Sequence, residues 1–154
     1  SKLNFHMVGS TENVDNISIA YIKKDLLKLE WFDNICHWAN KHEIDKRIFS
    51  RERFALKKTI MFHLSNLGIK ELPKEMEELS VVVLDLGDNH FTIFPDVIYK
   101  FKKLFCFSIE NNQISHISEE IISLQILKEL NVSNNRLKNL PDNLFKLKNL
   151  AELN

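Results

Sequence analysis

A chain of 154 residues is long enough for about one domain and leaves no room for a second large module. With 44% hydrophobic residues, 27% charged residues and only three glycines and three prolines, the composition excludes collagenous, low-complexity and wholly disordered chains. The 21 basic and 21 acidic groups balance at pH 7, so no general electrostatic attraction to nucleic acid or anionic lipid is expected.

The distribution of apolar residues and cysteines excludes two further classes of protein. No apolar run approaches the roughly 18 residues that a membrane span needs. The two cysteines, Cys36 and Cys106, are too few for a disulfide framework, and the N-terminus lacks the charged, apolar and small-residue order of a signal peptide. A reducing, cytoplasmic compartment is therefore expected.

The first 58 residues carry no repeat. Residues 1–15 contain many turn-forming residues and no hydrophobic period, which predicts a flexible segment. From about Ile17 apolar residues recur at an approximate helical spacing, and Ser50 would be the N-cap of a second short helix ending near Lys57. We therefore predict a helical N-terminal cap over residues 16–58, which would cover the first turn of a stacked repeat. An independent helical binding module is the alternative.

A repeat of 23 residues organises residues 59–154. Two apolar columns and one asparagine column illustrate it: Val81, Leu104, Leu127 and Leu150; Leu84, Phe107, Leu130 and Leu153; and Asn89, Asn112 and Asn135. An earlier unit, from Phe62 to Met76, is one residue shorter and has Leu67 in place of the asparagine. About four repeats and the start of a fifth are therefore expected.

The unit at residues 127–147, LKELNVSNNRLKNLPDNLFKL, resembles the leucine-rich repeat in its 23-residue form, LxxLxLxxNxLxxLPxxLxxLxx. The resemblance extends over about residues 59–154. It implies an α/β fold, a right-handed solenoid in which each unit adds one short strand to a parallel concave β-sheet, behind the N-terminal helical cap. It also implies that the chain recognises a protein partner through the concave face.

The residues themselves support this fold. Residues Leu130–Val132 alternate with period two, as in a strand with one buried face. An asparagine amide carries both donors and an acceptor, so the asparagine column can satisfy buried backbone groups of neighbouring turns. Pro73, Pro95 and Pro141 open the convex segments of their units, and Ser118 takes this place in the third. Because proline fixes φ and lacks an N–H, each convex segment is predicted to be a short irregular or extended return.

The candidate binding surface consists of side chains that alternate with the core positions and so project from the concave face. Its residues are Met61, His63, Val83, Asp85, Phe105, Cys106, Ser108, Glu110, Glu129 and Asn131. The N-terminal positions, Ile60 and Val82 included, are mostly apolar, whereas the C-terminal ones are acidic or carry amides. Because contiguous exposed apolar surface usually marks an interaction site, we predict a graded protein-binding surface. The alternative is that the N-terminal segment covers Val82–Cys106.

Neither a catalytic site nor a metal site is predicted. His63, Asp85 and Ser108 fall in one column, but the carboxylate lies between the other two, whereas a catalytic base must contact its nucleophile. Cys36 shares a stretch of seven residues with two histidines, yet no second Cys/His pair accompanies them. We therefore expect a non-enzymatic interaction scaffold without cofactor or metal.

The C-terminal end raises a separate expectation. No polar capping sequence follows Leu153, so the last turn would expose a strand edge and an apolar core. A longer natural chain or fraying of the last turn would explain this, and a second copy covering the end, giving a homo-oligomer, is the alternative. The alternative function is accordingly that of an N-terminal or regulatory fragment of a larger signalling or secreted effector protein, whose activity lies outside this chain.

Overall fold

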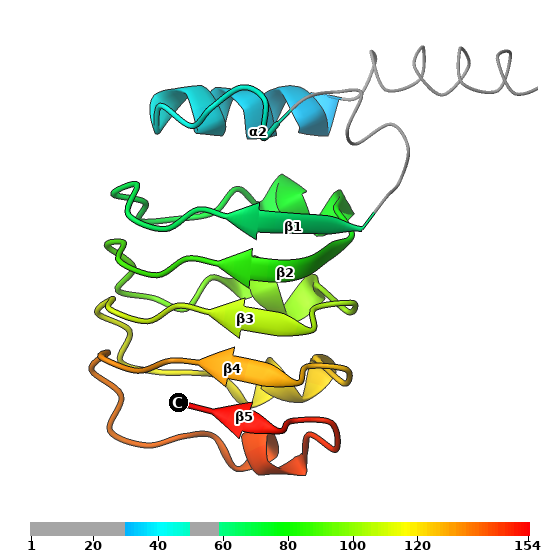
Figure 1. Cartoon of the computed structure of the whole chain (residues 1–154), viewed down its shortest axis with the longest axis vertical. Coiled ribbons are helices and arrows are strands. Elements are labelled where there is room, and N and C mark those ends of the chain that lie inside the picture. Colours follow the sequence, from blue (N-terminus) through cyan, green and yellow to red (C-terminus); the bar gives the residue numbers. More distant parts are fainter. Residues whose placement is uncertain (1–29, 50–58) are drawn as a thin grey trace, which may run out of the picture.

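The computed structural model describes residues 30–49 and 59–154. The predicted flexible segment at 1–15 and the predicted helix at Ser50–Lys57 lie outside the described residues. In the described part, one α-helix is followed by five strands that alternate with four 3₁₀ helices (Figure 1). No helix in these two ranges has the length and apolar character needed to cross a membrane.

The strands form one parallel sheet in chain order. They are β1 (Ile60–His63), β2 (Val81–Asp85), β3 (Cys106–Ser108), β4 (Glu129–Asn131) and β5 (Glu152–Leu153). From β2 onward the paired residues are 23 apart, as for Leu84, Phe107 and Leu130. Each strand is thus one turn of a coil, which confirms the α/β solenoid that the repeat predicts.

The shorter first unit is accommodated where β1 pairs with β2. Ile60 pairs with Val81, but the next residue, Met61, pairs with Val83, so the register shifts between them. From there His63 and Asp85 pair at a spacing of 22. The missing residue is therefore absorbed at the start of β1, and the rest of the strand keeps the alternation of the later units.

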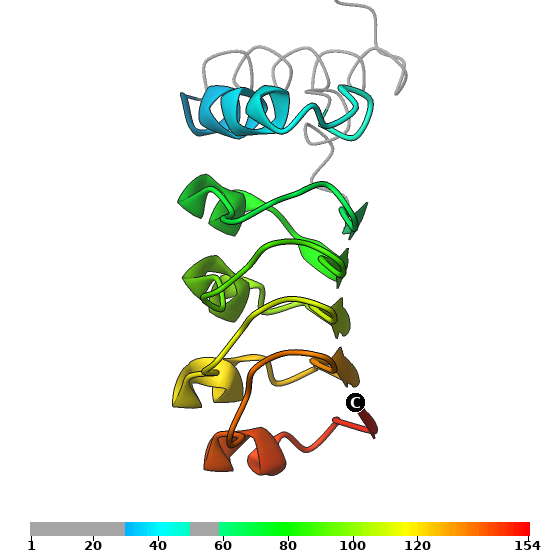
Figure 2. The same ribbon diagram turned by 90° about the vertical axis from the view of Figure 1, so that its left-hand side faces the viewer.

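Four 3₁₀ helices form the convex side, opposite the sheet (Figure 2). They are η1 (Lys74–Glu78), η2 (Asp96–Lys100), η3 (Glu119–Ser123) and η4 (Asp142–Lys146). Pro73, Pro95 and Pro141 immediately precede three of them, with φ near the value that the proline ring fixes. Ser118 precedes η3, and its side chain accepts a hydrogen bond from the Glu120 N–H. The predicted short convex return is therefore a single 3₁₀ turn.

The core lies between the sheet and the 3₁₀ helices. Leu84, Phe107 and Leu130 point into it from the strands, and the convex side contributes Ile98 and Ile121, all of them buried. Each such side chain removed from water stabilises the fold by roughly 1.5–3 kcal/mol. Because these contacts join one turn to the next, the stability of the solenoid comes from stacking rather than from any single unit.

Helix α2 (Glu30–Lys41) covers the first turn of the coil, where it packs on η1 (Figure 1). Its buried face includes Ile35 and Trp38, and the Trp38 indole Nε1 donates a hydrogen bond of 3.0 Å to the Glu71 carbonyl. Phe49, beyond the helix, stacks on Phe62 of β1 with ring centroids 5.0 Å apart. The described part of the N-terminal region is therefore helical and closes the apolar end of the coil.

Each of the first four strands leads into a turn that contains a left-handed residue. These residues are Asn66, Asp88, Asn111 and Asn134, with φ between 53° and 56°. Asparagine and aspartate adopt this conformation more readily than other residues with a side chain. Sequence reasoning missed this column, although it repeats at the same interval as the asparagine column and one residue before it.

Candidate protein-binding surface

The asparagine column holds the turns that follow the strands. The Asn89 Nδ2 donates to the carbonyls of Leu64, Leu86 and Gly87, and its Oδ1 accepts from the N–H groups of Leu67 and Ile69. Asn112 and Asn135 repeat this pattern one and two turns further on. The three amides are thus aligned along the coil, and each joins two neighbouring turns. Leu67 replaces the asparagine in the first unit, where it is half-buried.

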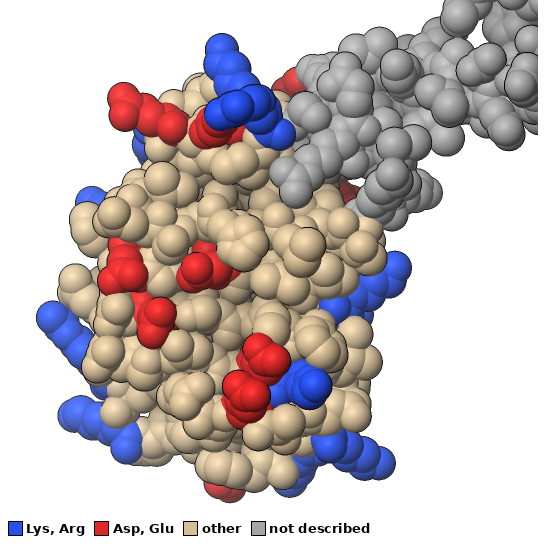
Figure 3. Space-filling model, in the orientation of Figure 1, with Lys and Arg blue, Asp and Glu red and all other residues tan. Residues whose placement is uncertain are grey.

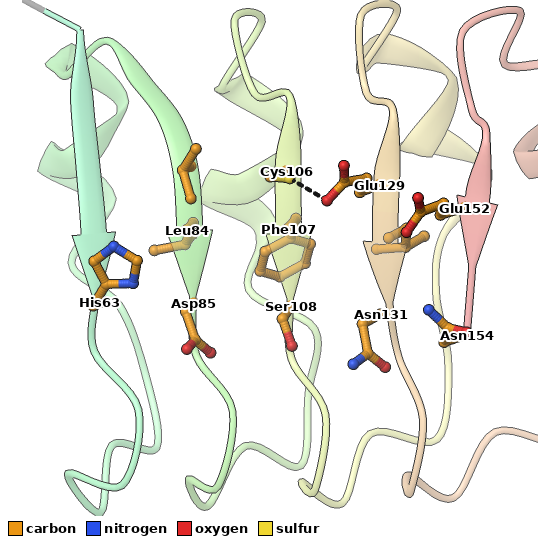
Figure 4. Close-up of a pocket in the computed structure, with 12 residues that line it drawn as sticks. His63, Leu84, Asp85, Cys106, Phe107, Ser108, Glu129, Asn131, Glu152 and Asn154 are labelled. Atoms are coloured by element: carbon orange, nitrogen blue, oxygen red, sulfur yellow. Dashed lines mark hydrogen bonds between the residues drawn. The ribbon is translucent and has the colours of Figure 1, made fainter.

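The strands present their alternate side chains to solvent in two rows. The first row consists of Met61, Val83, Cys106, Glu129 and Glu152, and the second of His63, Asp85, Ser108 and Asn131. Together with residues between them, both rows line a shallow hollow of about 310 Å³ on the sheet face (Figure 4). We call this face the concave surface. The structure thus brings together nearly all of the residues that the sequence proposes for binding.

The N-terminal half of the concave surface is partly apolar. Met61 is 56% exposed and Phe105 43% exposed, while Val83 and Cys106 are half-buried. Lys128 holds its Nζ 5.5 Å from the centre of the Phe105 ring, a cation–π contact between consecutive units. The assignment of Ile60 to this surface is wrong, because its side chain is 3% exposed and belongs to the core. The register shift next to Ile60 explains why the alternation did not place it correctly.

The second row also helps to order the turns that follow the strands. The Asp85 Oδ1 accepts from the Gly87 N–H at 2.9 Å, and the Asn131 Oδ1 accepts from the Ser133 N–H at 3.1 Å. Such turns are typical of aspartate and asparagine, whose side chains bond to the backbone two residues on. A Cβ at Gly87 would lie 3.2 Å from the Asp85 Oδ1, so a larger residue there would disturb this turn.

Glu110 lies on the edge of the concave surface beside the second row. It is half-buried, and its Oε2 accepts a hydrogen bond of 2.9 Å from the Asn131 Nδ2 on the neighbouring strand. Its backbone N–H lies 3.5 Å from the Ser108 Oγ, at the limit of hydrogen bonding. The side chains of the second row are therefore held in place by contacts within and between units.

The column of His63, Asp85 and Ser108 does not have the geometry of a catalytic triad. These residues lie on β1, β2 and β3, with the carboxylate on the middle strand (Figure 4). Because adjacent strands are roughly 4.8 Å apart, the imidazole and the hydroxyl start from backbones about 10 Å apart. The Asp85 carboxylate accepts from the Gly87 N–H. The arrangement offers no contact between a base and a nucleophile.

Cys106 is held in its protonated form. Burial, followed by the hydrogen bond to Glu129, raises the pKa of the Cys106 thiol to about 11. The Sγ donates to the Glu129 Oε2 at 2.7 Å, as the dashed line in Figure 4 shows. Since the thiolate is the reactive form of cysteine, this side chain has little nucleophilic character near neutral pH.

A metal site is not formed by the described side chains. In residues 30–49 and 59–154, no group of three or more His, Cys, Asp or Glu side chains converges in a way that could hold a metal ion. Cys36 is half-buried on α2, and the His42 Nδ1 lies 2.9 Å from the Trp38 carbonyl oxygen. The proximity of these residues in sequence therefore does not become a set of ligands.

Comparisons with known proteins agree with this architecture. Residues 127–147 match the family described as Leucine Rich Repeat. A leucine-rich-repeat protein of Leptospira interrogans whose structure is solved is similar to this chain, with 30% identity and a TM-score of 0.48. The similar region covers 68% of this chain and 33% of that one, so this chain spans about a third of its length. The search of curated proteins found no match.

Parallel strands stacked turn upon turn, with a hydrogen-bonded asparagine in successive units, define a repeat solenoid of the kind that serves protein interaction. The chain is a leucine-rich-repeat protein, as the unit at residues 127–147 and its aligned neighbours show.

Proposed function

We propose that this chain is a non-enzymatic scaffold that binds a protein partner through the concave surface. The observation that carries the proposal is the hollow of about 310 Å³, which both rows of strand side chains line. Exposed apolar side chains, Met61 and Phe105 among them, lie on the N-terminal half of the same surface. A rigid surface that combines apolar area with polar side chains is typical of protein interaction.

The state of the polar groups supports a binding role over a catalytic one. The Cys106 thiol is protonated and bonded to Glu129, and the Asp85 carboxylate is bonded to the backbone of its own turn. A nucleophile needs a base within hydrogen-bond reach, and His63 lies two strands away from Ser108. These groups are therefore better suited to present a fixed surface than to transfer protons.

A matched pair of variants tests the proposal. Val83→Arg places a cation in the middle of the apolar half of the concave surface, whereas Ile93→Arg makes the same change at a side chain that is 77% exposed off the sheet. Partners would be captured from native lysate on each folded variant and compared by mass spectrometry. We expect Val83→Arg to lose proteins that both the unaltered chain and Ile93→Arg retain. Identical sets of proteins on all three would contradict the proposal.

Three further statements are proposed from the sequence. A cytoplasmic location is based on the two cysteines, and fractionation of cells that express the chain tests it. The balanced charge argues against nucleic acid as the partner, which a gel-shift assay at low salt checks. A homo-oligomer through the C-terminal turn is tested by sedimentation, because Leu153 of β5 is 37% exposed.

A further inference from the structure

We propose that the partner presents an extended segment in which a lysine or arginine lies three to four residues from an apolar side chain. Glu129 and Glu152 bind the cation, and the apolar side chain packs on Val83 and Phe105. This inference rests on the proposed function, since it names the chemistry of the partner that the concave surface recognises.

The cation-binding end is formed by two carboxylates that lie side by side. Glu129 and Glu152 are directly paired on β4 and β5, and their side chains project from the same face (Figure 4). Parallel strands are roughly 4.8 Å apart, and like charges in directly opposed positions destabilise a sheet. A guanidinium group, with its five donors in a planar fork, has the size and charge to bridge two carboxylates at this distance.

The charge of this glutamate pair is not balanced by the described side chains. The hydrogen bond from Cys106 to Glu129 comes from a neutral thiol. Lys128 is adjacent in sequence, but its Nζ lies over the Phe105 ring. The ion pair formed within the described residues joins Asp45 to an arginine two residues further on, next to the helical cap. A cation from a partner would therefore remove a repulsion that the chain by itself leaves in place.

The wider concave surface has the same sign of charge. Asp85 and Glu110 add two further carboxylates, so that Lys128 is the one cationic group among four acidic ones in the strand rows and at their edges. Figure 3 shows the acidic side chains over the face of the sheet, while most of the basic ones lie at its lateral margins. The chain as a whole carries no net charge, so this face is selectively acidic. Charge complementarity therefore favours a basic segment over an acidic peptide or a phosphate-bearing surface.

The distance between the two ends sets the spacing in the partner. Val83 lies on β2, and the glutamate pair lies on β4 and β5, two to three strands away. At roughly 4.8 Å per strand this separation is about 10–14 Å, and an extended chain rises about 3.3 Å per residue. Three to four residues of a segment that runs across the strands therefore join the apolar contact to the ionic one.

The test uses a display library of random peptides of about 12 residues, long enough to cross all five strands. The library is panned against the full chain, and the selected peptides are synthesised for measurement of Kd by fluorescence polarisation. We expect enrichment of lysine or arginine three to four positions from an apolar residue. The double variant Glu129→Gln/Glu152→Gln should bind these peptides roughly tenfold more weakly, and added salt should weaken binding to the unaltered chain.

A matched control removes two carboxylates elsewhere. Glu77→Gln/Glu78→Gln makes the same change at exposed side chains of η1 on the convex side, and it should leave Kd unchanged. Selected peptides without basic enrichment, or an unchanged Kd for the Glu129→Gln/Glu152→Gln variant, would overturn the inference. If those peptides still lose binding to Val83→Arg, the proposed function stands and only the partner chemistry is wrong. If no selected peptide distinguishes Val83→Arg from the unaltered chain, both proposals fail.

Discussion

Replacing Asn89 by alanine should destabilise the solenoid by about 2–3 kcal/mol. The side chain is 4% exposed and accepts from the N–H groups of Leu67 and Ile69. In the variant the buried Ile69 N–H loses its acceptor, which costs about 1–3 kcal/mol, and the half-buried Leu67 N–H adds a smaller loss. The Leu86 carbonyl keeps a partner, because the Asn112 Nδ2 also donates to it. The loss of the donated bonds is therefore only partial.

Urea denaturation followed by circular dichroism measures this effect. For a chain of this length the melting temperature should also fall by roughly 5–10 °C. Asn34→Ala is the control, because Asn34 is exposed on α2 and donates to the Glu75 Oε1 at 3.2 Å, so its free energy of unfolding should change by about 0.5 kcal/mol or less. Asn135 is half-buried, so its replacement by alanine should cost less than that of Asn89. An Asn89→Ala variant no less stable than Asn34→Ala would refute the structural role of the amide.

Four further predictions concern stability and reactivity. Ile109→Ala, at a fully buried position, should lower the free energy of unfolding by about 2–5 kcal/mol in urea titrations, and a loss below 1 kcal/mol would contradict the packing. Ser118→Pro suits the local φ of −72° but removes the hydrogen bond from the Ser118 N–H to the Tyr99 hydroxyl and the cap of η3, so a net loss of about 1 kcal/mol is expected. The loss should shrink when Tyr99→Phe is already present, which a double-mutant cycle checks. Cys106, with its raised pKa, should be alkylated on the order of tenfold more slowly than an exposed cysteine at about pH 8, and Glu129→Gln should speed the reaction, as peptide mapping would show. Burial raises the pKa of Tyr99 to about 12, against about 10 when unfolded, so the folded state binds more protons in this interval and stability should fall as pH rises through it. Urea midpoints that do not change across the interval would contradict this assignment.

The repeat in the sequence predicted the fold because it records burial directly. Positions such as Leu84, Phe107 and Leu130 recur at 23 residues since each must enter the same layer of the core. The asparagine column was predictable for a related reason, because a buried turn needs both donors and acceptors at one place. The left-handed column beside it carried an equally regular signal, and reading Asn111 and its counterparts as turn residues would have found it.

Other features depend on partners that are distant in the sequence. Ile60 follows the period-two pattern, but the register shift that buries it arises only when β1 pairs with β2. Ser118 looked like a simple replacement of proline, whereas its backbone N–H donates to the Tyr99 hydroxyl of the previous turn. Pattern alone cannot show such contacts, because they depend on which atoms of two turns approach each other.

The sequence by itself determined the solenoid, its register over the later units and the side of each strand that faces solvent. These properties follow from periodic burial, which every unit repeats and which stacking neighbours satisfy in the same way. Only the tertiary structure decided the state of the surface groups: that the Cys106 thiol is bonded to Glu129, and that Glu129 lies beside Glu152 without a cation among the described residues. The physical reason is that hydrogen bonds and charge pairs depend on distances of a few ångströms between units, which a spacing in sequence does not specify.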